Sequence, residues 1–211
     1  MHTLRDTAHS QNVSRQENNM KQFISEDLKE EFYITLYFNI ENGFEIAGLK
    51  RAYLDFNRTL KIPDGNSEKR KIIQNESQDF LKNDLINLIN RKINSQDNFD
   101  KEHRNVCNRL IDFWNELSYG QAQKWVNMTL KYWLLFGENR INSIERNAMY
   151  FHIPIDSYVQ KGMFSENNPR PWSKIDNYDE YFEYQLLHRD KNTKNPPIID
   201  EFIFFNKYKT N

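Results

Sequence analysis

The sequence predicts an all-α fold with one hydrophobic core. Apolar side chains recur at helical spacing along most of the chain. Turns containing Gly, Pro or Asn separate these periodic segments. Aromatic residues make up 14% of the sequence and provide bulky core side chains, although 28% of the residues are charged. With 211 residues, the chain is long enough for one such domain and short for two large ones.

The N-terminal sequence indicates a tail that is followed by the first helix of the domain. Residues 1–18 lack periodic apolar positions and are rich in polar residues, so we expect a mobile tail before a single helical domain over residues 19–211. Apolar positions become frequent in residues 23–38. The run Tyr33–Phe38 is aromatic and β-branched, which fits either a strand or a buried helix, and the helical context favours a helix.

Residues 49–95 show clearer helical spacing. The first helix has apolar positions at Leu49, Tyr53, Phe56 and Leu60. Pro63–Gly65 ends it. Residues 67–95 predict one or two amphipathic helices, and residues 95–98 predict a loop.

Residues 104–136 predict two helices joined by a tight turn. The expected core positions are Val106, Leu110, Ile111, Trp114 and Leu117 in the first helix and Ala122, Val126, Leu130, Trp133 and Leu134 in the second. We expect Gly120 to stop the first helix, because glycine readily adopts the conformation that ends helices. The second helix then spans residues 121–136, which gives a helix-hairpin-helix.

The C-terminal third predicts shorter elements. Pro154 favours extended structure before it, so a helix is expected to start at Asp156 and run to residue 163. A proline-containing loop at residues 168–171 precedes a helix over residues 176–188. The aromatic tail, residues 198–208, is expected to dock on the body.

Composition limits the classes of function. A net charge of −1 gives no bulk attraction to nucleic acid. Cys107 is the single cysteine, which excludes an intrachain disulfide and predicts a buried thiol. The five histidines show no ligand spacing, so we expect no metal and no cofactor. No apolar run is long enough for a membrane span or a signal sequence, which predicts a soluble cytoplasmic protein without membrane contact.

Lys124 and Asp156 form the sharpest chemical pattern. Lys124 lies early in a predicted helix, where the positive end of the helix dipole favours a neutral amine. An amine and a carboxylate together can attack the anomeric carbon of a sugar and stabilise the cation that develops. The turn before the lysine, with Tyr119, Gly120 and Ala122, offers free N–H groups that could bind a phosphate.

Structural roles for the same residues stay open. A lysine in the first turns of a helix is ordinarily solvated, and Asp156 after a proline is most simply an N-cap. Trp125 has the spacing of a core residue. Trp172 lies outside any periodic pattern and fits either a core anchor or a pocket wall. His152 is expected to be a hydrogen-bonded histidine near the core.

The sequences GQAQKWVN at residues 120–127 and IPIDSYV at residues 153–159 resemble the helix-hairpin-helix DNA glycosylases. Gly120 matches a hairpin glycine, Lys124 the catalytic lysine and Asp156 the downstream aspartate of that family. The spacing of 32 residues, 156 minus 124, is similar to that of the archaeal 8-oxoguanine glycosylase branch. The likeness covers residues 106–163. The chain departs from the family pattern at Tyr119, Ala122 and Tyr158, and it lacks the four-cysteine cluster of the iron–sulfur members.

This resemblance implies a DNA glycosylase, with a possible lyase step, that acts on a modified purine such as 8-oxoguanine. It implies that Lys124 attacks C1′ of a flipped nucleotide and that Asp156 stabilises the developing charge. Candidate side chains for holding the flipped base are Trp172, Trp125, Tyr158 and Ser173. The alternative is a non-catalytic or repurposed module of this fold that binds nucleic acid or a partner protein, similar to members in bacterial antiviral gene clusters.

Overall fold

The computed structural model describes residues 23–60, 67–191 and 194–210. Within these ranges every regular element is helical, which confirms the all-α prediction. The predicted tail, residues 1–18, lies outside the described residues. The chain divides into two compact units, one ending at Tyr37 and one spanning Phe38–Asn211, so the predicted domain of residues 19–211 extends over both.

The first unit contains α2, Glu26–Tyr37. The ambiguous run at Tyr33–Phe38 is therefore helical up to Tyr37. Glu26 and Asp27 lie in the first turn, where negative side chains favour the helix dipole. Leu28, Phe32 and Leu36 are all more than half exposed.

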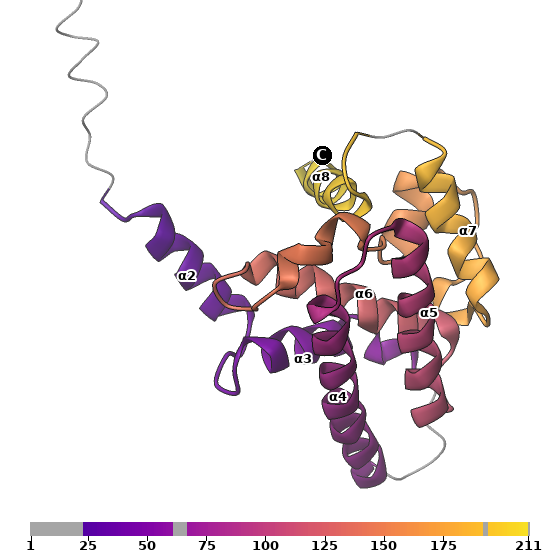
Figure 1. Ribbon diagram of the computed structural model, residues 1–211, viewed down its shortest axis with the longest axis horizontal. Helices are drawn as coiled ribbons and strands as arrows, with labels where there is room; N and C mark the ends of the chain where they lie inside the picture. The colour runs from indigo at the N-terminus through magenta and orange to yellow at the C-terminus, as the bar shows by residue number, and fades with distance from the viewer. Residues whose placement is uncertain (1–22, 61–66, 192–193, 211) are drawn as a thin grey trace, which may run out of the picture. The chain divides into compact units, whose positions relative to one another are not determined.

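The second unit begins with a run of helices whose order along the chain can be followed in Figure 1. These are α3 (Phe44–Phe56), η2 (Asn57–Thr59), α4 (Ser67–Asn90), α5 (Gln96–Phe113) and α6 (Tyr119–Phe136). The segment predicted as one or two helices is the single helix α4. The loop predicted at residues 95–98 is wrong, because the Ser95 hydroxyl accepts the Asn98 N–H and begins α5 there.

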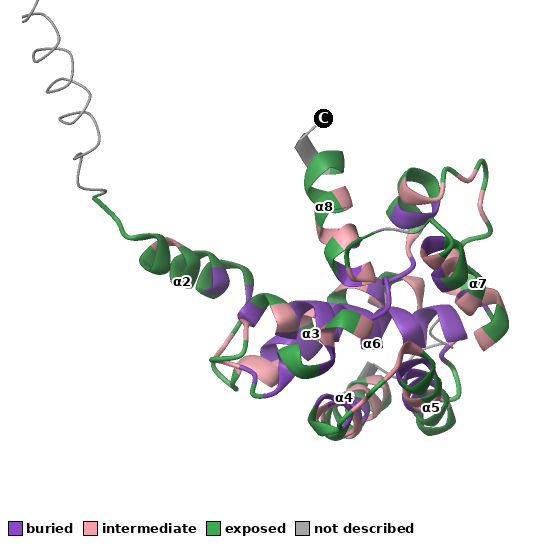
Figure 2. Cartoon of the chain, turned by 45° about the horizontal axis from the view of Figure 1, so that its top comes forward, coloured by how far each residue is buried: buried purple, intermediate pink, exposed green. Residues whose placement is uncertain are grey.

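Helix α6 is the central element of this unit, and every residue from Tyr119 to Trp133 is buried (Figure 2). It packs most extensively against α3. The indole N–H groups of Trp125 and Trp133 donate to the α3 carbonyls of Leu49 and Glu45, at 3.1 and 3.0 Å. Because α6 is buried all round, each of its polar side chains needs a partner inside the protein.

The connection between α5 and α6 differs from the predicted hairpin. Helix α5 ends at Phe113, and α6 begins directly after Ser118. Ser118 and Gln121 form a capping box, in which each side chain bonds the backbone N–H of the other residue. The prediction that Gly120 stops the first helix is therefore wrong, since Gly120 is the second residue of α6.

The chain after α6 forms shorter helices that cover one side of it. These are η3 (Ile144–Tyr150), the π-helical turn η4 (Val159–Met163), η5 (Trp172–Lys174), α7 (Tyr178–Arg189) and α8 (Pro197–Thr210). The predicted aromatic tail is thus a helix, α8. Among the described residues, no helix is both long and apolar enough to cross a lipid bilayer.

Candidate active site

Lys124 and Asp156, 32 residues apart in sequence, form an ion pair. The Lys124 Nζ lies 2.6 Å from the Asp156 Oδ2. The lysine side chain, from the first turns of α6, is 5% exposed, whereas the aspartate side chain is 22% exposed. The next two residues, Ser157 and Tyr158, are exposed. The pair therefore reaches solvent on the aspartate side.

Asp156 also begins the turn that leads into η4. Its Oδ1 accepts the backbone N–H groups of Tyr158 and Val159, both at 2.9 Å. Burial alone would raise the pKa of the Asp156 carboxyl. The charge and hydrogen bond of Lys124, together with the two N–H groups, outweigh burial and hold this pKa below its ordinary value. The expected N-cap and the expected ionic role therefore coexist in one carboxylate.

The predicted phosphate site at Tyr119, Gly120 and Ala122 is closed in this structure, because its residues are buried and two of its N–H groups are bonded within the protein. The Gly120 N–H donates to the Ile175 carbonyl at 2.9 Å, and the Ala122 N–H donates to the Ser118 carbonyl at 3.0 Å. Tyr119 and Ala122 are 3% and 0% exposed. The start of α6 is thus sealed by the protein and offers no open cradle for a phosphate.

The backbone of η5 provides this seal. A Cβ at Gly120 would lie 1.8 Å from the Trp172 carbonyl oxygen, so only glycine fits there. The Ser118 hydroxyl donates to the Ser173 carbonyl at 2.8 Å. Since Gly120 and Lys124 are four residues apart on one helix face, η5 lies over the face that carries the lysine one turn later. Trp172 and Ser173 are both half-buried, and their backbone carbonyls contact Gly120 and Ser118, at the start of the helix that carries Lys124.

The other two candidate base-binding residues, Trp125 and Tyr158, lie in different surroundings. Trp125 is 0% exposed and packs against Tyr53, Phe56 and Trp114 in the core, so its prediction as a stacking residue is wrong. Tyr158 is 43% exposed, follows Asp156 by two residues and contacts the Tyr208 ring edge-on at 5.4 Å. It remains a candidate.

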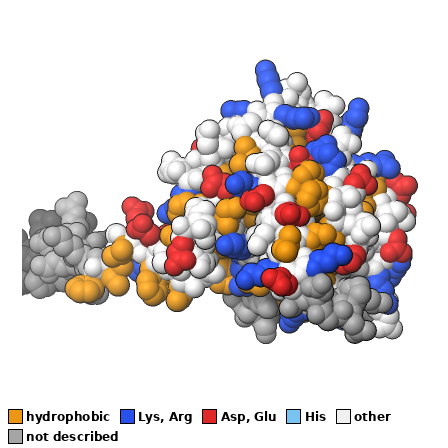
Figure 3. All heavy atoms as spheres, turned by 90° about the horizontal axis from the view of Figure 1, so that it is seen from below, with side chains coloured by type: hydrophobic (Ala, Val, Ile, Leu, Met, Phe, Trp, Pro, Cys, Tyr) orange, Lys and Arg blue, Asp and Glu red, His pale blue; other side chains and the backbone are white. Residues whose placement is uncertain are grey.

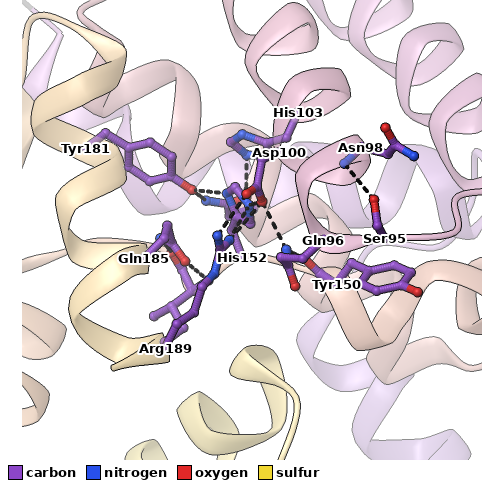
Figure 4. Close-up of polar contacts among 12 residues, drawn as sticks. Ser95, Gln96, Asn98, Asp100, His103, Tyr150, His152, Tyr181, Gln185 and Arg189 are labelled. Atoms are coloured by element: carbon purple, nitrogen blue, oxygen red, sulfur yellow. Dashed lines mark hydrogen bonds and ion pairs between the residues drawn. The ribbon is translucent and has the colours of Figure 1, made fainter. Parts of the chain in front are cut away.

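A buried polar network, which the sequence did not predict, lies between α5, α6 and α7 (Figure 4). His152 contacts the Asp100 Oδ1 through its Nε2 and the Tyr181 hydroxyl through its Nδ1, both at 2.8 Å. Arg189 donates two hydrogen bonds to the Asp100 carboxylate, both at 2.8 Å. His103 contacts the Asn127 Oδ1 at 2.8 Å. His152 is thus the hydrogen-bonded core histidine that was expected.

Burial and pairing fix the charges in this network. Burial lowers the pKa of His103 well below 6.5, and the neighbouring His152 lowers it further. Burial likewise lowers the pKa of His152. Burial would raise the pKa of Asp100, but hydrogen bonds from His152 and Arg189 outweigh it and hold this pKa below its ordinary value. The network therefore combines two neutral imidazoles with an ionised carboxylate and its arginine partner.

Two glutamines hold the extended segment that ends at Asp156. The Gln123 side chain accepts the Ile155 N–H at 3.2 Å and donates to the Ile155 carbonyl at 2.8 Å. The Gln185 side chain makes the same pair of bonds to Ile153, at 3.0 and 2.9 Å. Both glutamines are at most 1% exposed. For Gln123 the only sequence signal is a polar residue within an otherwise buried helix, and Gln185 lies on α7, where few residues are buried.

Helix α6 carries a second buried lysine, Lys131. Its Nζ lies 2.7 and 2.6 Å from the two carboxylate oxygens of Glu201 on α8. The lysine and glutamate side chains are 9% and 5% exposed, so this pair is more enclosed than Lys124 and Asp156. It provides a natural internal reference for the candidate site.

Two further features bear on ligands. In the ranges that the structure describes, no three His, Cys, Asp or Glu side chains converge so as to hold a metal ion. An apolar hollow of about 600 Å³ lies away from the ion pair. It is lined by Leu134, Leu135, Glu145, Ala148, Met149, Pro196, Ile198, Ile199 and Phe202.

Searches of protein-family models, characterised proteins and solved structures gave no significant match to this chain.

Proposed function

We propose that this chain is a DNA glycosylase, with an associated lyase step, that acts on a modified purine such as 8-oxoguanine. Lys124 is the nucleophile and Asp156 is its carboxylate partner. The single observation that carries the proposal is the 2.6 Å contact between the Lys124 Nζ and the Asp156 Oδ2, formed by residues 32 positions apart. A nucleophile within hydrogen-bond reach of a base is the arrangement that covalent catalysis requires.

The surroundings of the pair support a chemical role. A buried ion pair contributes little net stability, because desolvation of both charges offsets their attraction. Perturbed ionisable groups beside an opening are typical of functional sites. Asp156 is such a group, since its carboxylate is partly exposed and its pKa is lowered.

The reaction follows from these two side chains. Asp156 accepts a proton from the Lys124 ammonium, and the neutral amine attacks C1′ of the flipped nucleotide. The bond between C1′ and the base nitrogen breaks, and the base leaves with the bonding electrons and takes up the proton that Asp156 received. Loss of a second proton from nitrogen and opening of the sugar ring give a Schiff base. Removal of a C2′ proton then expels the 3′ phosphate.

We assign the holding of the flipped base to three residues, two on η5 and one next to Asp156 in sequence. We assign the aromatic surface to Trp172 on η5, whose backbone carbonyl lies against Gly120, one turn before Lys124. Tyr158 provides an exposed ring next to Asp156. Ser173 adds a hydroxyl on the same short helix. Stacking on an aromatic ring with a few polar contacts is how flipped bases are held.

Borohydride trapping tests this proposal. A duplex containing 8-oxoguanine is incubated with the protein and borohydride, which reduces the Schiff base to a stable covalent adduct. We expect an adduct with the native chain and with the double variant Lys131→Met, Glu201→Gln, which leaves no unpaired charge, and none with Lys124→Met. Lys131 is a matched control because it is also a buried, carboxylate-paired lysine on α6. A panel of modified bases without adduct or strand cleavage would refute the proposal.

A second candidate is a non-catalytic module that binds nucleic acid or a protein. The sealed start of α6 favours it, because the hairpin N–H groups do not face solvent. The face of the molecule drawn in Figure 3 carries Lys and Arg side chains interspersed with Asp and Glu. DNA affinity that falls with salt, without base release, would support this candidate, and the slope would count the phosphate contacts. Absence of DNA affinity would instead support binding to a partner protein.

A further inference from the structure

We infer that Gln123 is a positioning residue for the Lys124–Asp156 pair, because it fixes the backbone of Ile155 against α6. This inference rests on the proposed function for its catalytic consequence. The position of the pair itself can be measured without any activity. Gln123 precedes Lys124 on α6, and Ile155 precedes Asp156, so one side-chain amide links the neighbours of both reacting groups.

The amide of Gln123 makes four hydrogen bonds. Its Nε2 donates to the carbonyls of Gly120 and Ile155, at 2.9 and 2.8 Å. Its Oε1 accepts the Ile155 N–H at 3.2 Å and the Asn127 Nδ2–H at 3.1 Å. Both donors and the oxygen are thus occupied in a site that is 0% exposed. An amide held in this way has one orientation.

This orientation determines the hydrogen bonds of the whole buried network. Because the Gln123 Oε1 must accept from Asn127, the Asn127 Oδ1 faces His103 and accepts its Nε2–H. The second Asn127 Nδ2–H donates to the Tyr181 hydroxyl at 2.9 Å. The Tyr181 O–H then donates to the His152 Nδ1.

The far end of the network completes this assignment. The His152 Nε2–H donates to the Asp100 carboxylate, and Arg189 donates to the same group. Each polar hydrogen along this path has one acceptor, so the orientation of the Gln123 amide and the hydrogen-bond directions of the network determine each other. The Ile155 backbone is therefore held by a side-chain amide whose own hydrogen bonds continue into this buried network.

The catalytic consequence concerns geometry. The Asp156 carboxylate must stay within proton-transfer distance of the Lys124 amine, now 2.6 Å away. Misplacement of a reacting group by about 1 Å costs on the order of 100-fold in rate. Gln185 makes the same two bonds to Ile153, two residues further from Asp156, so it holds the segment without adjoining the pair.

The test compares Gln123→Met with Gln185→Met. Both changes keep side-chain volume and remove two bonds to the same extended segment. Gln123→Met also removes the bonds to Gly120 and Asn127, so the larger loss of thermal stability is expected from Gln123→Met. Proton–nitrogen NMR of the lysine ammonium groups reports on the pair, with Lys124 assigned by its absence in Lys124→Met. The buried Lys131 ammonium serves as an internal reference in the same spectrum.

We expect Gln123→Met to lose the Lys124 signal and to keep the Lys131 signal. Base release should fall about 100-fold in kcat, with KM nearly unchanged. Gln185→Met should keep both signals and remain within about threefold of the native kcat. A retained Lys124 signal in Gln123→Met, or equal effects of the two changes, would overturn the inference. If the native chain releases no base, the glycosylase proposal fails, and the NMR comparison still decides the role of Gln123.

Gln123→Glu provides a second variant if Gln123→Met does not fold. A protonated glutamic acid can accept the Ile155 N–H and donate to the Ile155 carbonyl, whereas the ionised form cannot donate. Burial favours the protonated form as the pH falls. The Lys124 signal of this variant should therefore recover on lowering the pH from about 8 to about 5. No recovery in a folded chain would count against the inference.

Discussion

Replacement of Gly120 by alanine separates two roles for this residue. If Gly120 makes room for a phosphate, Gly120→Ala would leave the stability of the free protein unchanged and would weaken its binding to DNA. If Gly120 instead makes room for the η5 backbone, its replacement by alanine would destabilise the free protein. The structure favours the second role, because the Trp172 carbonyl oxygen occupies the space beside Gly120. We therefore expect Gly120→Ala to lower the free energy of unfolding.

The magnitude follows from the contacts. The new Cβ would lie 1.8 Å from the Trp172 oxygen, which must retreat by at least 1.2 Å to reach the 3.0 Å limit of real contacts. This retreat disrupts the bonds from Gly120 to Ile175 and from Ser118 to Ser173, worth about 1 kcal/mol each. Overpacking adds about 1–3 kcal/mol, and the better helix propensity of alanine returns about 1 kcal/mol. The net loss is about 2–4 kcal/mol.

Urea unfolding followed by circular dichroism measures this change. Gly162→Ala is the matched control, because its Cβ would meet the end of the Phe204 ring at 2.5 Å, and a side chain can turn away where a backbone cannot. We expect the smaller loss from Gly162→Ala. A change of less than about 0.5 kcal/mol for Gly120→Ala, with reduced DNA affinity, would refute the packing argument and restore the phosphate role.

Three further predictions concern buried groups. Because burial lowers the pKa of His103 and His152 below 6.5, the unfolded chain takes up protons first, and the free energy of unfolding should fall as the pH drops below about 6.5. Urea titrations should show up to about 1.4 kcal/mol per pH unit for each histidine, and a flat profile from about pH 7 to 5 would contradict this. Lys131→Met leaves Glu201 buried without its partner and should cost about 3–5 kcal/mol in unfolding free energy, whereas adding Glu201→Gln should recover most of it in a double-mutant cycle. Burial raises the pKa of the Cys107 thiol to about 12, so it should react with a thiol reagent only after unfolding, and rapid labelling of the native protein would show that this site opens.

The sequence predicted the helical class because helical spacing is a local pattern, whereas the family resemblance indicated Lys124 and Asp156 as a pair. Lys124 lies early in a helix with clear apolar spacing, and Asp156 follows a proline at a helix start. The structure brings these two residues into contact. The activity of the pair stays a prediction.

Errors arose where a role depends on distant residues. Gly120 looked like a helix stop, but its neighbour is Trp172, far along the chain. Trp125 looked available for stacking, although its ring is enclosed by Tyr53, Phe56 and Trp114. No local pattern contains such contacts.

The buried network was missed for a related reason. Asp100 and His103 lie in the part of α5 that was expected to precede the helix, so their face could not be assigned. Their partners Tyr181 and Arg189 come from α7. A polar residue on a buried helix, such as Asn127, was the one available signal, and it indicates that partners exist without identifying them.

The carboxylate of Asp156 divides its two oxygens between different tasks. Its Oδ2 faces the Lys124 ammonium, and its Oδ1 holds the N–H groups of Tyr158 and Val159. The carboxylate therefore cannot rotate toward a bound molecule without releasing the first turn of the chain that follows it. A ligand that reaches Lys124 from this side by displacing the Asp156 carboxylate must therefore also unwind the turn at residue 157. Such binding would be detected as faster amide exchange at Tyr158 and Val159.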